Sequence, residues 1–124
     1  MTEPIELACL AARTAASKQA EAVTVLDVRD LIGITDFFVI ASGTSERQVT
    51  TIAEEIAKAL KPLGGRTVRR EGETGARWVL LDFVDLVVHV FHEEEREYYR
   101  LDNLWADAPV VDWEAADAAT AGPA

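Results

Sequence analysis

One continuous segment, residues 36–60, constrains the fold of this chain more than any other. It begins with the run 37–41, which is apolar at every position, as is typical of a strand buried on both faces of a sheet. A short turn follows, in which Ser45 and Gln48 have the S-x-x-Q spacing of a helix capping box. Apolar residues then recur at helical intervals as far as Leu60, before a proline and two glycines that end the helix. The segment therefore predicts a strand, a turn and an amphipathic helix in an α/β protein.

The rest of the chain adds further strands and helices to this unit. The sequence pattern predicts helices over 4–19 and from residue 93 onward, and strands over 23–28, 66–71, 77–83 and 86–91. The resulting order, α-β-β-α-β-β-β-α, predicts a single-domain α/β protein with a mixed five-stranded sheet and flanking helices. The helix between the second and third strands should form a right-handed crossover that leaves those two strands parallel. Short loops should make the last three strands antiparallel neighbours.

The C-terminal end differs from the rest in composition and charge. Residues 106–124, beyond a predicted domain over 1–105, are rich in alanine and acidic residues and are predicted to form a mostly disordered tail. Residues 1–81 carry eleven acidic and ten basic side chains, whereas residues 82–124 carry eleven acidic and two basic ones. Such a negative field repels nucleic-acid phosphates and anionic lipid and attracts a basic protein surface. A purely solubilising role for the acidic end is the alternative.

Several features of the chain favour a cytoplasmic location. No apolar run reaches the roughly 18 residues that crossing a bilayer requires. The N-terminus is acidic where a signal peptide would be basic, and Cys9, the single cysteine, excludes an internal disulfide.

The turn at residues 42–45 lies between a strand and a helix, where backbone N–H groups can bind a phosphate. It resembles the Gly-Ser turn of nucleotidyltransferases. Their chemistry also needs two or three carboxylates that converge on magnesium, typically a D-x-D pair on one strand. The nearest candidates, Asp82 and Asp85, are three residues apart, and the chain contains no D-x-D around them. A turn that only caps the helix is therefore favoured, and no catalytic residue is assigned.

The two histidines do not predict a metal site. His89 and His92 are three residues apart across the end of a strand and would not share a face, and no cysteine or third histidine lies near them. No metal and no cofactor are therefore predicted, and His89 is interpreted as a hydrogen-bonded core or interface residue. Solvated strand ends, rather than a nucleic-acid site, are the favoured interpretation of the basic cluster formed by Arg66, Arg69, Arg70 and Arg77.

The predicted strand 77–83 is apolar on both faces. Trp78, Leu80 and Asp82 share one face, and three further apolar residues share the other. Either both faces are buried within the molecule, or one of them binds a partner. Tryptophan is frequent among the residues that anchor protein interfaces.

Four blocks follow one another over about residues 24–105: DFFVIASGTSERQV at 36–49, EG at 71–72, WVLLDFVDLVVHVF at 78–91 and YRLDNLW at 99–105. Together they resemble the ribosomal silencing factors, a family also called RsfS or Iojap. The resemblance implies a nucleotidyltransferase-like fold that acts as a binding module and not as an enzyme. It implies that the protein binds ribosomal protein L-fourteen of the large ribosomal subunit and sterically blocks association of the two subunits. Translation would thereby be repressed under starvation or in stationary phase.

The resemblance also implies where the partner binds. The candidate partner-binding residues are Trp78, Asp82, Phe83, Asp85, Glu94 and Tyr98. Trp78 matches the partner-facing tryptophan of the family, the next three residues lie in the same block at its border, and the last two lie in the acidic helix nearby. The resemblance implies no cofactor, no membrane and no specific nucleic acid.

Two other functions stay open at this point. A magnesium-dependent nucleotidyltransferase would use Ser45 with Asp82 or Asp85, and nucleotide binding with magnesium would reveal it. A self-associating adaptor would pair the apolar strand and the segment Leu104-Trp105 with a second copy, as a homodimer of the free protein. Light scattering over a dilution series would detect this homodimer.

Overall fold

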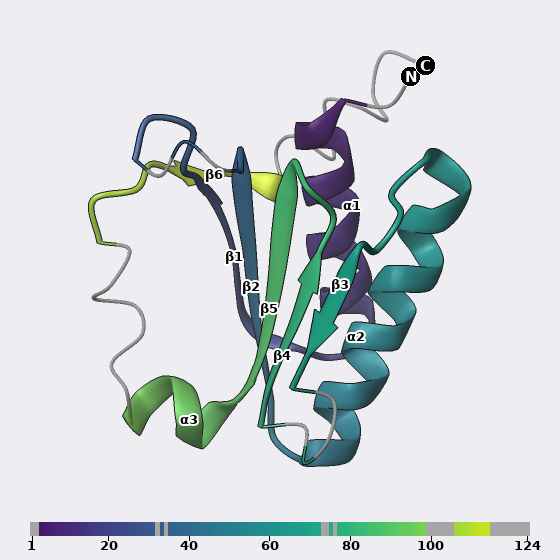
Figure 1. Cartoon of the computed structure of the whole chain (residues 1–124). Helices are drawn as coiled ribbons and strands as arrows, with labels where there is room; N and C mark the ends of the chain where they lie inside the picture. Colours follow the sequence, from purple (N-terminus) through teal and green to yellow (C-terminus); the bar gives the residue numbers. More distant parts are fainter. Residues whose placement is uncertain are drawn as a thin grey trace.

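The computed structural model describes residues 3–31, 33, 35–72, 75, 77–98 and 106–114, with only the backbone of Tyr98. The helices are α1 (Pro4–Ser17), α2 (Glu46–Leu60), the short 3-10 helix η1 (Lys61–Leu63) and α3 (Glu93–Tyr98). The strands are β1 (Glu21–Asp27), β2 (Phe37–Gly43), β3 (Arg69–Glu71), β4 (Trp78–Asp82), β5 (Leu86–His92) and β6 (Val110–Val111). The strands form one mixed sheet in the order β3-β4-β5-β2-β1-β6 (Figure 1).

The centre of the sheet joins two strands that are far apart in the sequence. β2 and β5 pair in parallel over their whole length, from Phe37 opposite Leu86 to Gly43 opposite His92. β4 pairs antiparallel with both β3 and β5, which confirms that the last three predicted strands are antiparallel neighbours. β2 and β3 run in the same direction, as predicted, but β4 and β5 lie between them.

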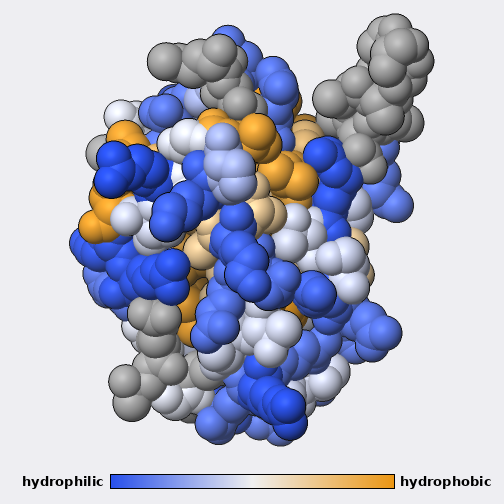
Figure 2. Space-filling model, turned by 90° about the vertical axis from the view of Figure 1, so that its right-hand side faces the viewer, coloured by the Kyte–Doolittle hydropathy of each residue, from blue (hydrophilic) through white to orange (hydrophobic). Residues whose placement is uncertain are grey.

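Two helices cover one face of this sheet. α1 and α2 lie side by side against it, whereas α3 lies on the other side (Figure 1). The predicted apolar stripe of α2 is buried in the main core, together with residues of α1 and alternate residues of β2, β4 and β5. The side of the molecule where α2 lies is mostly hydrophilic, as Figure 2 shows, because the outward residues of this helix are polar or charged. One face of the sheet is therefore fully used for folding.

The sheet has six strands and not the five predicted. The sixth, β6, lies in the segment predicted as a tail and pairs with β1, Val110 opposite Leu26 and Val111 opposite Val25. The amide of Asp27 donates to the carbonyl of Pro109 (2.9 Å) next to this pairing. A strand of two residues after a proline carries no usable alternation of apolar and polar residues, which is why the sequence pattern did not reveal it. Residues 99–105 and 115–124 lie outside the described residues, so the remainder of the tail stays a prediction.

Candidate partner-binding site

The second face of the sheet carries the aromatic side chains. Cross-strand pairing places Trp78 opposite Phe91, Leu80 opposite His89, and Val87 opposite Phe38. Residues that pair directly across strands point to the same side of a sheet. These six residues therefore form one surface opposite α1 and α2, called here the aromatic face: Phe38, Trp78, Leu80, Val87, His89 and Phe91.

The rings of the aromatic face are packed against one another. The centroid of the Trp78 ring lies 4.7 Å from that of Phe91, and the Phe38 and His89 rings meet edge to face at 4.9 Å. The His89 and Phe91 rings are parallel within 4° at 5.9 Å. Separations of this size are typical of favourable aromatic pairs. The cluster therefore holds its members in fixed positions.

His89 fixes the orientation of the tryptophan. The indole Nε1 of Trp78 donates a hydrogen bond to Nδ1 of His89 (3.2 Å). Burial of His89 lowers its pKa to about 4, so the imidazole is neutral at pH 7 and its Nδ1 can accept. This result agrees with the interpretation of His89 as a hydrogen-bonded residue.

Trp78 is the member of the aromatic face that reaches solvent most. Trp78 is 38% exposed, while three other members of the face, Phe38, Leu80 and Val87, are half-buried. Its partly buried ring is held by Phe91 and by the hydrogen bond to His89. A large ring that is held rigidly yet exposed loses little conformational entropy on binding, a property of interface anchors.

The predicted border residues lie on different sides of the sheet. Asp82 is half-buried on the side of the aromatic face, where its Oδ1 accepts from the amide of Val84 (2.8 Å) and its Oδ2 lies 3.9 Å from Arg69. Asp85 is exposed in the following turn. Phe83 is buried in the main core on the helix-covered side, so it supports the turn and does not belong to the surface around Trp78.

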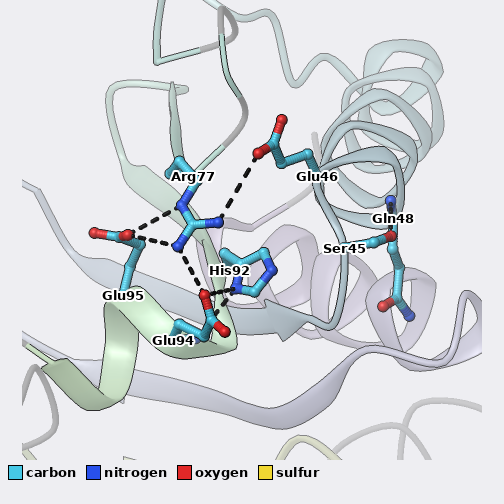
Figure 3. Close-up of polar contacts among 7 residues, drawn as sticks. All are labelled: Ser45, Glu46, Gln48, Arg77, His92, Glu94 and Glu95. Atoms are coloured by element: carbon cyan, nitrogen blue, oxygen red, sulfur yellow. Dashed lines mark hydrogen bonds and ion pairs between the residues drawn. The ribbon is translucent and has the colours of Figure 1, made fainter.

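Glu94 belongs to a polar cluster at the start of α3 (Figure 3). Its Oε1 lies 3.0 Å from Nη2 of Arg77. The same Nη2 lies 2.9 Å from Oε1 of Glu95, and Nη1 of Arg77 lies 3.9 Å from Oε2 of Glu46. The hydrogen bonds that Arg77 donates to Glu94 and Glu95 hold its pKa above the ordinary value. The amide of Glu94 donates to Nδ1 of His92 (3.2 Å). The cluster ties α3 to the beginning of β4, and it leaves the Glu94 carboxylate largely exposed. The side chain of Tyr98 lies outside the described residues.

The turn at residues 42–45 is occupied by a side chain of the protein itself. Oε1 of Gln48 accepts from the amide of Thr44 (2.7 Å), and Oγ of Ser45 accepts from the amide of Gln48 (3.1 Å). The amide nitrogen of the Gln48 side chain donates to the carbonyls of Lys18 and Gln19. The glutamine thus links the end of α1 to the start of α2, and its oxygen takes up the Thr44 N–H that could otherwise donate to a phosphate. Among the described residues, no three histidine, cysteine or acidic side chains converge as metal ligands.

Sequence reasoning missed the role of Arg96. This α3 residue is buried, and its Nη1 donates to the carbonyl of Ala22 (2.8 Å) and to Oγ of Ser42 (2.9 Å). Both acceptors are more than fifty residues away in the sequence, at the start of β1 and the end of β2. The one local signal is a single cation within an acidic helix, which is equally typical of a solvated helix.

Comparisons with known proteins agree with this architecture. A family model described as "Ribosomal silencing factor during starvation" matches residues 1–124. Ribosomal silencing factor RsfS of Halalkalibacterium halodurans is 48% identical over 109 residues, which are 88% of this chain and 93% of that protein. A mouse protein named "Mitochondrial assembly of ribosomal large subunit protein 1" is 35% identical over 91 residues, 71% of this chain and 40% of the mouse protein.

The fold is also similar to that of solved structures. The crystal structure of a Chromobacterium violaceum protein superimposes with a TM-score of 0.81 at 32% identity, covering 85% of this chain and 88% of that one. In the part of the chain that the structure describes, no helix is both long and apolar enough to cross a membrane. The match over the whole sequence and the high identity of the relatives show that this chain belongs to the RsfS family of ribosomal silencing factors.

Proposed function

We propose that the aromatic face binds ribosomal protein L-fourteen on the large ribosomal subunit, and that the bound protein keeps the small subunit from joining. The observation that carries the proposal is the exposed and rigidly held indole of Trp78. A rigid aromatic ring can enter a pocket of the partner at low entropic cost. The family supports a ribosome-associated silencing role, and the name of the mouse relative refers to the large subunit.

Charge around the aromatic face suits a basic partner. Asp82 and Asp85 lie at one end of β4, and the exposed carboxylates of Glu93, Glu94 and Glu97 lie on α3. Ribosomal proteins are typically basic because they contact RNA, so opposite charges would steer the encounter and set its orientation. The aromatic face would then supply most of the affinity, since exposed charges contribute more to association rate than to free energy.

Silencing of this kind needs no catalysis. A protein that occupies part of the surface where the subunits meet excludes the other subunit by its volume, provided that it binds tightly enough. The turn at residues 42–45, which a nucleotidyltransferase would use, is closed by Gln48, and this observation disfavours the enzyme. The proposed role places the protein in the cytoplasm with the ribosomes.

Sedimentation of the protein with separated ribosomal subunits tests the proposal. Wild-type protein should migrate with the large subunit through a sucrose gradient and reduce the joined ribosomes formed after magnesium is restored. Trp78→Ala should weaken this binding by about 2 kcal/mol, roughly thirtyfold in Kd. Ile5→Ala is the matched control, because Ile5 is an apolar side chain of similar exposure (40%) on α1, on the opposite side of the sheet.

Circular dichroism and thermal unfolding must show that both variants are folded. A folded Trp78→Ala variant that blocks joining at the wild-type concentration would refute the assignment of the aromatic face. Asp85→Lys provides a second probe, since Asp85 is exposed and its reversal should slow association without disturbing the core.

The aromatic face also favours a second candidate, the homodimer of the free protein. Two copies that met through Trp78 would bury the same residues as the ribosomal partner. Light scattering over a dilution series should then show a dimer that dissociates on dilution and that Trp78→Ala weakens. A strictly monomeric wild-type protein at high concentration would eliminate this candidate.

A further inference from the structure

A basic cavity lies at the far end of α2, on the helix-covered side of the edge strand β3. It has a volume of about 260 Å³ and is lined by Ala57, Lys61, Gly65, Arg66, Thr67 and Arg70. Its position follows from the register of the sheet: Arg70 pairs with Leu81, whose side chain is in the main core, so Arg70 points to the side of the helices. Arg69, its neighbour on β3, points to the opposite side, toward Asp82.

The close turn after η1 shapes this cavity. The backbone of Gly64 has a φ of +90°, a conformation that glycine adopts without strain. A Cβ atom at Gly65 would lie 2.8 Å from Cβ of Leu60 and 3.0 Å from its carbonyl oxygen, so the chain can pass this close to α2 only with glycine there. The turn thereby places Arg66 and Thr67 in the wall of the same cavity as Lys61.

Two of the cations in this cavity are not balanced by the described residues around them. Three of its six lining residues are cationic, and none is acidic. Neither Lys61 nor Arg66 forms an ion pair with any described residue, whereas Arg29, Arg69 and Arg77 each contact a carboxylate. Two uncompensated cations held near each other repel, and this arrangement is found in a chain whose net charge is −10. An anion in the cavity would relieve the repulsion.

The helix end does not account for this concentration of charge. The last carbonyl groups of α2 carry a partial negative charge equivalent to roughly half an elementary charge, and Lys61 as the capping residue is well placed beside them. The two full positive charges of Lys61 and Arg66 exceed that partial charge several-fold. The remaining positive charge is available to bind an anionic ligand.

We propose that this basic cavity binds a phosphate group of the RNA backbone on the ribosome. Guanidinium groups pair with phosphate oxygens through two parallel hydrogen bonds, and the ammonium of Lys61 and the hydroxyl of Thr67 supply further donors. No aromatic residue lines the cavity, so it offers no surface for stacking a base, and its volume is smaller than that of usual small-molecule sites. It therefore fits one backbone phosphate better than a whole nucleotide.

The inference rests on the association of this family with ribosomes, which brings the chain beside RNA. It adds a second contact to the one proposed for the aromatic face. The two sites lie on opposite sides of the sheet but close to the same edge, because Arg70 lies on the edge strand β3 and Trp78 on its neighbour β4. Contacts to phosphates position a protein on RNA without reading its sequence. Such a contact therefore agrees with the prediction that the chain binds no specific nucleic acid.

The first test measures binding to purified large subunits at increasing KCl concentrations. The double variant Lys61→Gln with Arg66→Gln should bind several-fold more weakly at low salt, and its affinity should depend less on salt. In a plot of log K against log salt, the slope should fall by about one unit for each phosphate that the variant no longer binds. The matched control is Arg47→Gln with Lys58→Gln, which removes the same charge from exposed positions of α2 that do not line the cavity. Equal losses in both double variants, or no loss in the first, would overturn the proposal.

The second test does not depend on the partner of the aromatic face. The full-length, ¹⁵N-labelled protein is titrated at low salt with a short RNA hairpin, with ATP and with inorganic phosphate, and the amide signals of Gly65, Arg66 and Thr67 are followed by NMR. The hairpin should shift these signals in the wild-type protein and in Trp78→Ala, but not in the double variant at Lys61 and Arg66. Shifts with ATP or phosphate but not with the hairpin would assign the cavity to free phosphates and overturn the RNA source, and no shift with any of them would overturn the site.

Discussion

A single hydrogen bond connects the most exposed ring of the aromatic face to a histidine in its interior. Because Nδ1 of His89 accepts a hydrogen bond from the Trp78 indole N–H, this contact requires the neutral imidazole. Burial, which lowers the pKa of His89 to about 4, stabilises that form. The orientation of the candidate anchor therefore depends on the protonation state of a neighbour.

The stability of the protein should consequently depend on pH through His89. The unfolded chain binds a proton at His89 below about pH 6.5, whereas the folded chain binds one only below about pH 4. The contribution is therefore fully present above pH 6.5 and is lost as the pH falls toward 4, by about 3 kcal/mol in total. Urea unfolding at several pH values should show this loss in the wild type.

His89→Gln is the control, because a glutamine can accept from the indole but does not titrate. The difference between the two free energies of unfolding should change between pH 6.5 and 4. The hydrogen bonds from Arg29 lower the pKa of Asp27, so any effect of that carboxyl falls below its ordinary pKa of 3.8, outside this window. Parallel curves for wild type and variant would contradict the assigned pKa of His89.

Arg96 makes a second prediction at the scale of a residue. Arg96→Met keeps the apolar stem but removes the hydrogen bonds to Ala22 and Ser42. Since Ser42 is buried, we expect a loss of about 2–3 kcal/mol in the free energy of unfolding. Arg47→Met, at an exposed position of α2, should change stability by less than about 0.5 kcal/mol. Equal stability of the two variants would show that Arg96 does not hold α3.

At the scale of elements, the turn between β4 and β5 departs most from ordinary geometry. Val84 is 56% exposed with a φ of +76°, and the amide of Asp85 donates to the carbonyl of Phe83 (3.0 Å). This is the arrangement of the rare γ-turn with a positive φ, which is strained for a β-branched residue. Asp82, which accepts from the amide of Val84, helps to hold it.

Val84→Gly should therefore stabilise the protein. Relief of the backbone strain, of the order of 1–3 kcal/mol, exceeds the larger chain entropy of glycine in the unfolded state, about 0.5–1 kcal/mol. We expect a net gain of about 1 kcal/mol, measured as a higher midpoint in thermal unfolding. Val84→Ala is the control, because alanine also has a Cβ and keeps most of the strain. A glycine variant no more stable than the alanine variant would show that the turn is not strained.

Elements were predictable where local chemistry determines them. The cap formed by Ser45, the apolar stripe of α2 and the alternation of β4 all follow from neighbouring residues, and each is present. β6 was missed because pairing with β1, more than eighty residues away, makes this two-residue segment a strand. Within the candidate site, Trp78 was proposed from the strand pattern and the family resemblance, and the structure places it on the aromatic face. The contacts of His89 and Arg96 come from tertiary packing and leave no periodic signal.

At the scale of the whole molecule, residues 106–114 close one edge of the sheet. β6 covers β1, Nε1 of Trp113 donates to the carbonyl of Val23 (3.1 Å), and Ala108 packs in the small core formed with Leu26 and Ile40. Without this segment β1 would be an exposed edge strand, a common site of unwanted pairing between molecules.

Removal of residues 109–124 should thus destabilise the protein by about 2 kcal/mol, or roughly 10 °C in Tm, because hydrogen bonds and burial at β1 are removed. It should also promote self-association through the edge of β1, visible by light scattering. Removal of residues 115–124 alone leaves β6 and Trp113 in place and should change neither property. If both truncations behave alike, β6 does not protect the edge.

The parallel pairing of β2 with β5 also determines when the sheet can form during synthesis of the chain. The first half of the chain contains both helices of the covered face, but β2 must wait for β5, which ends at His92, before the sheet has a centre. The aromatic face, drawn from β2, β4 and β5, does not exist until that late stage of translation. A growing chain therefore lacks the complete aromatic face during most of its own synthesis.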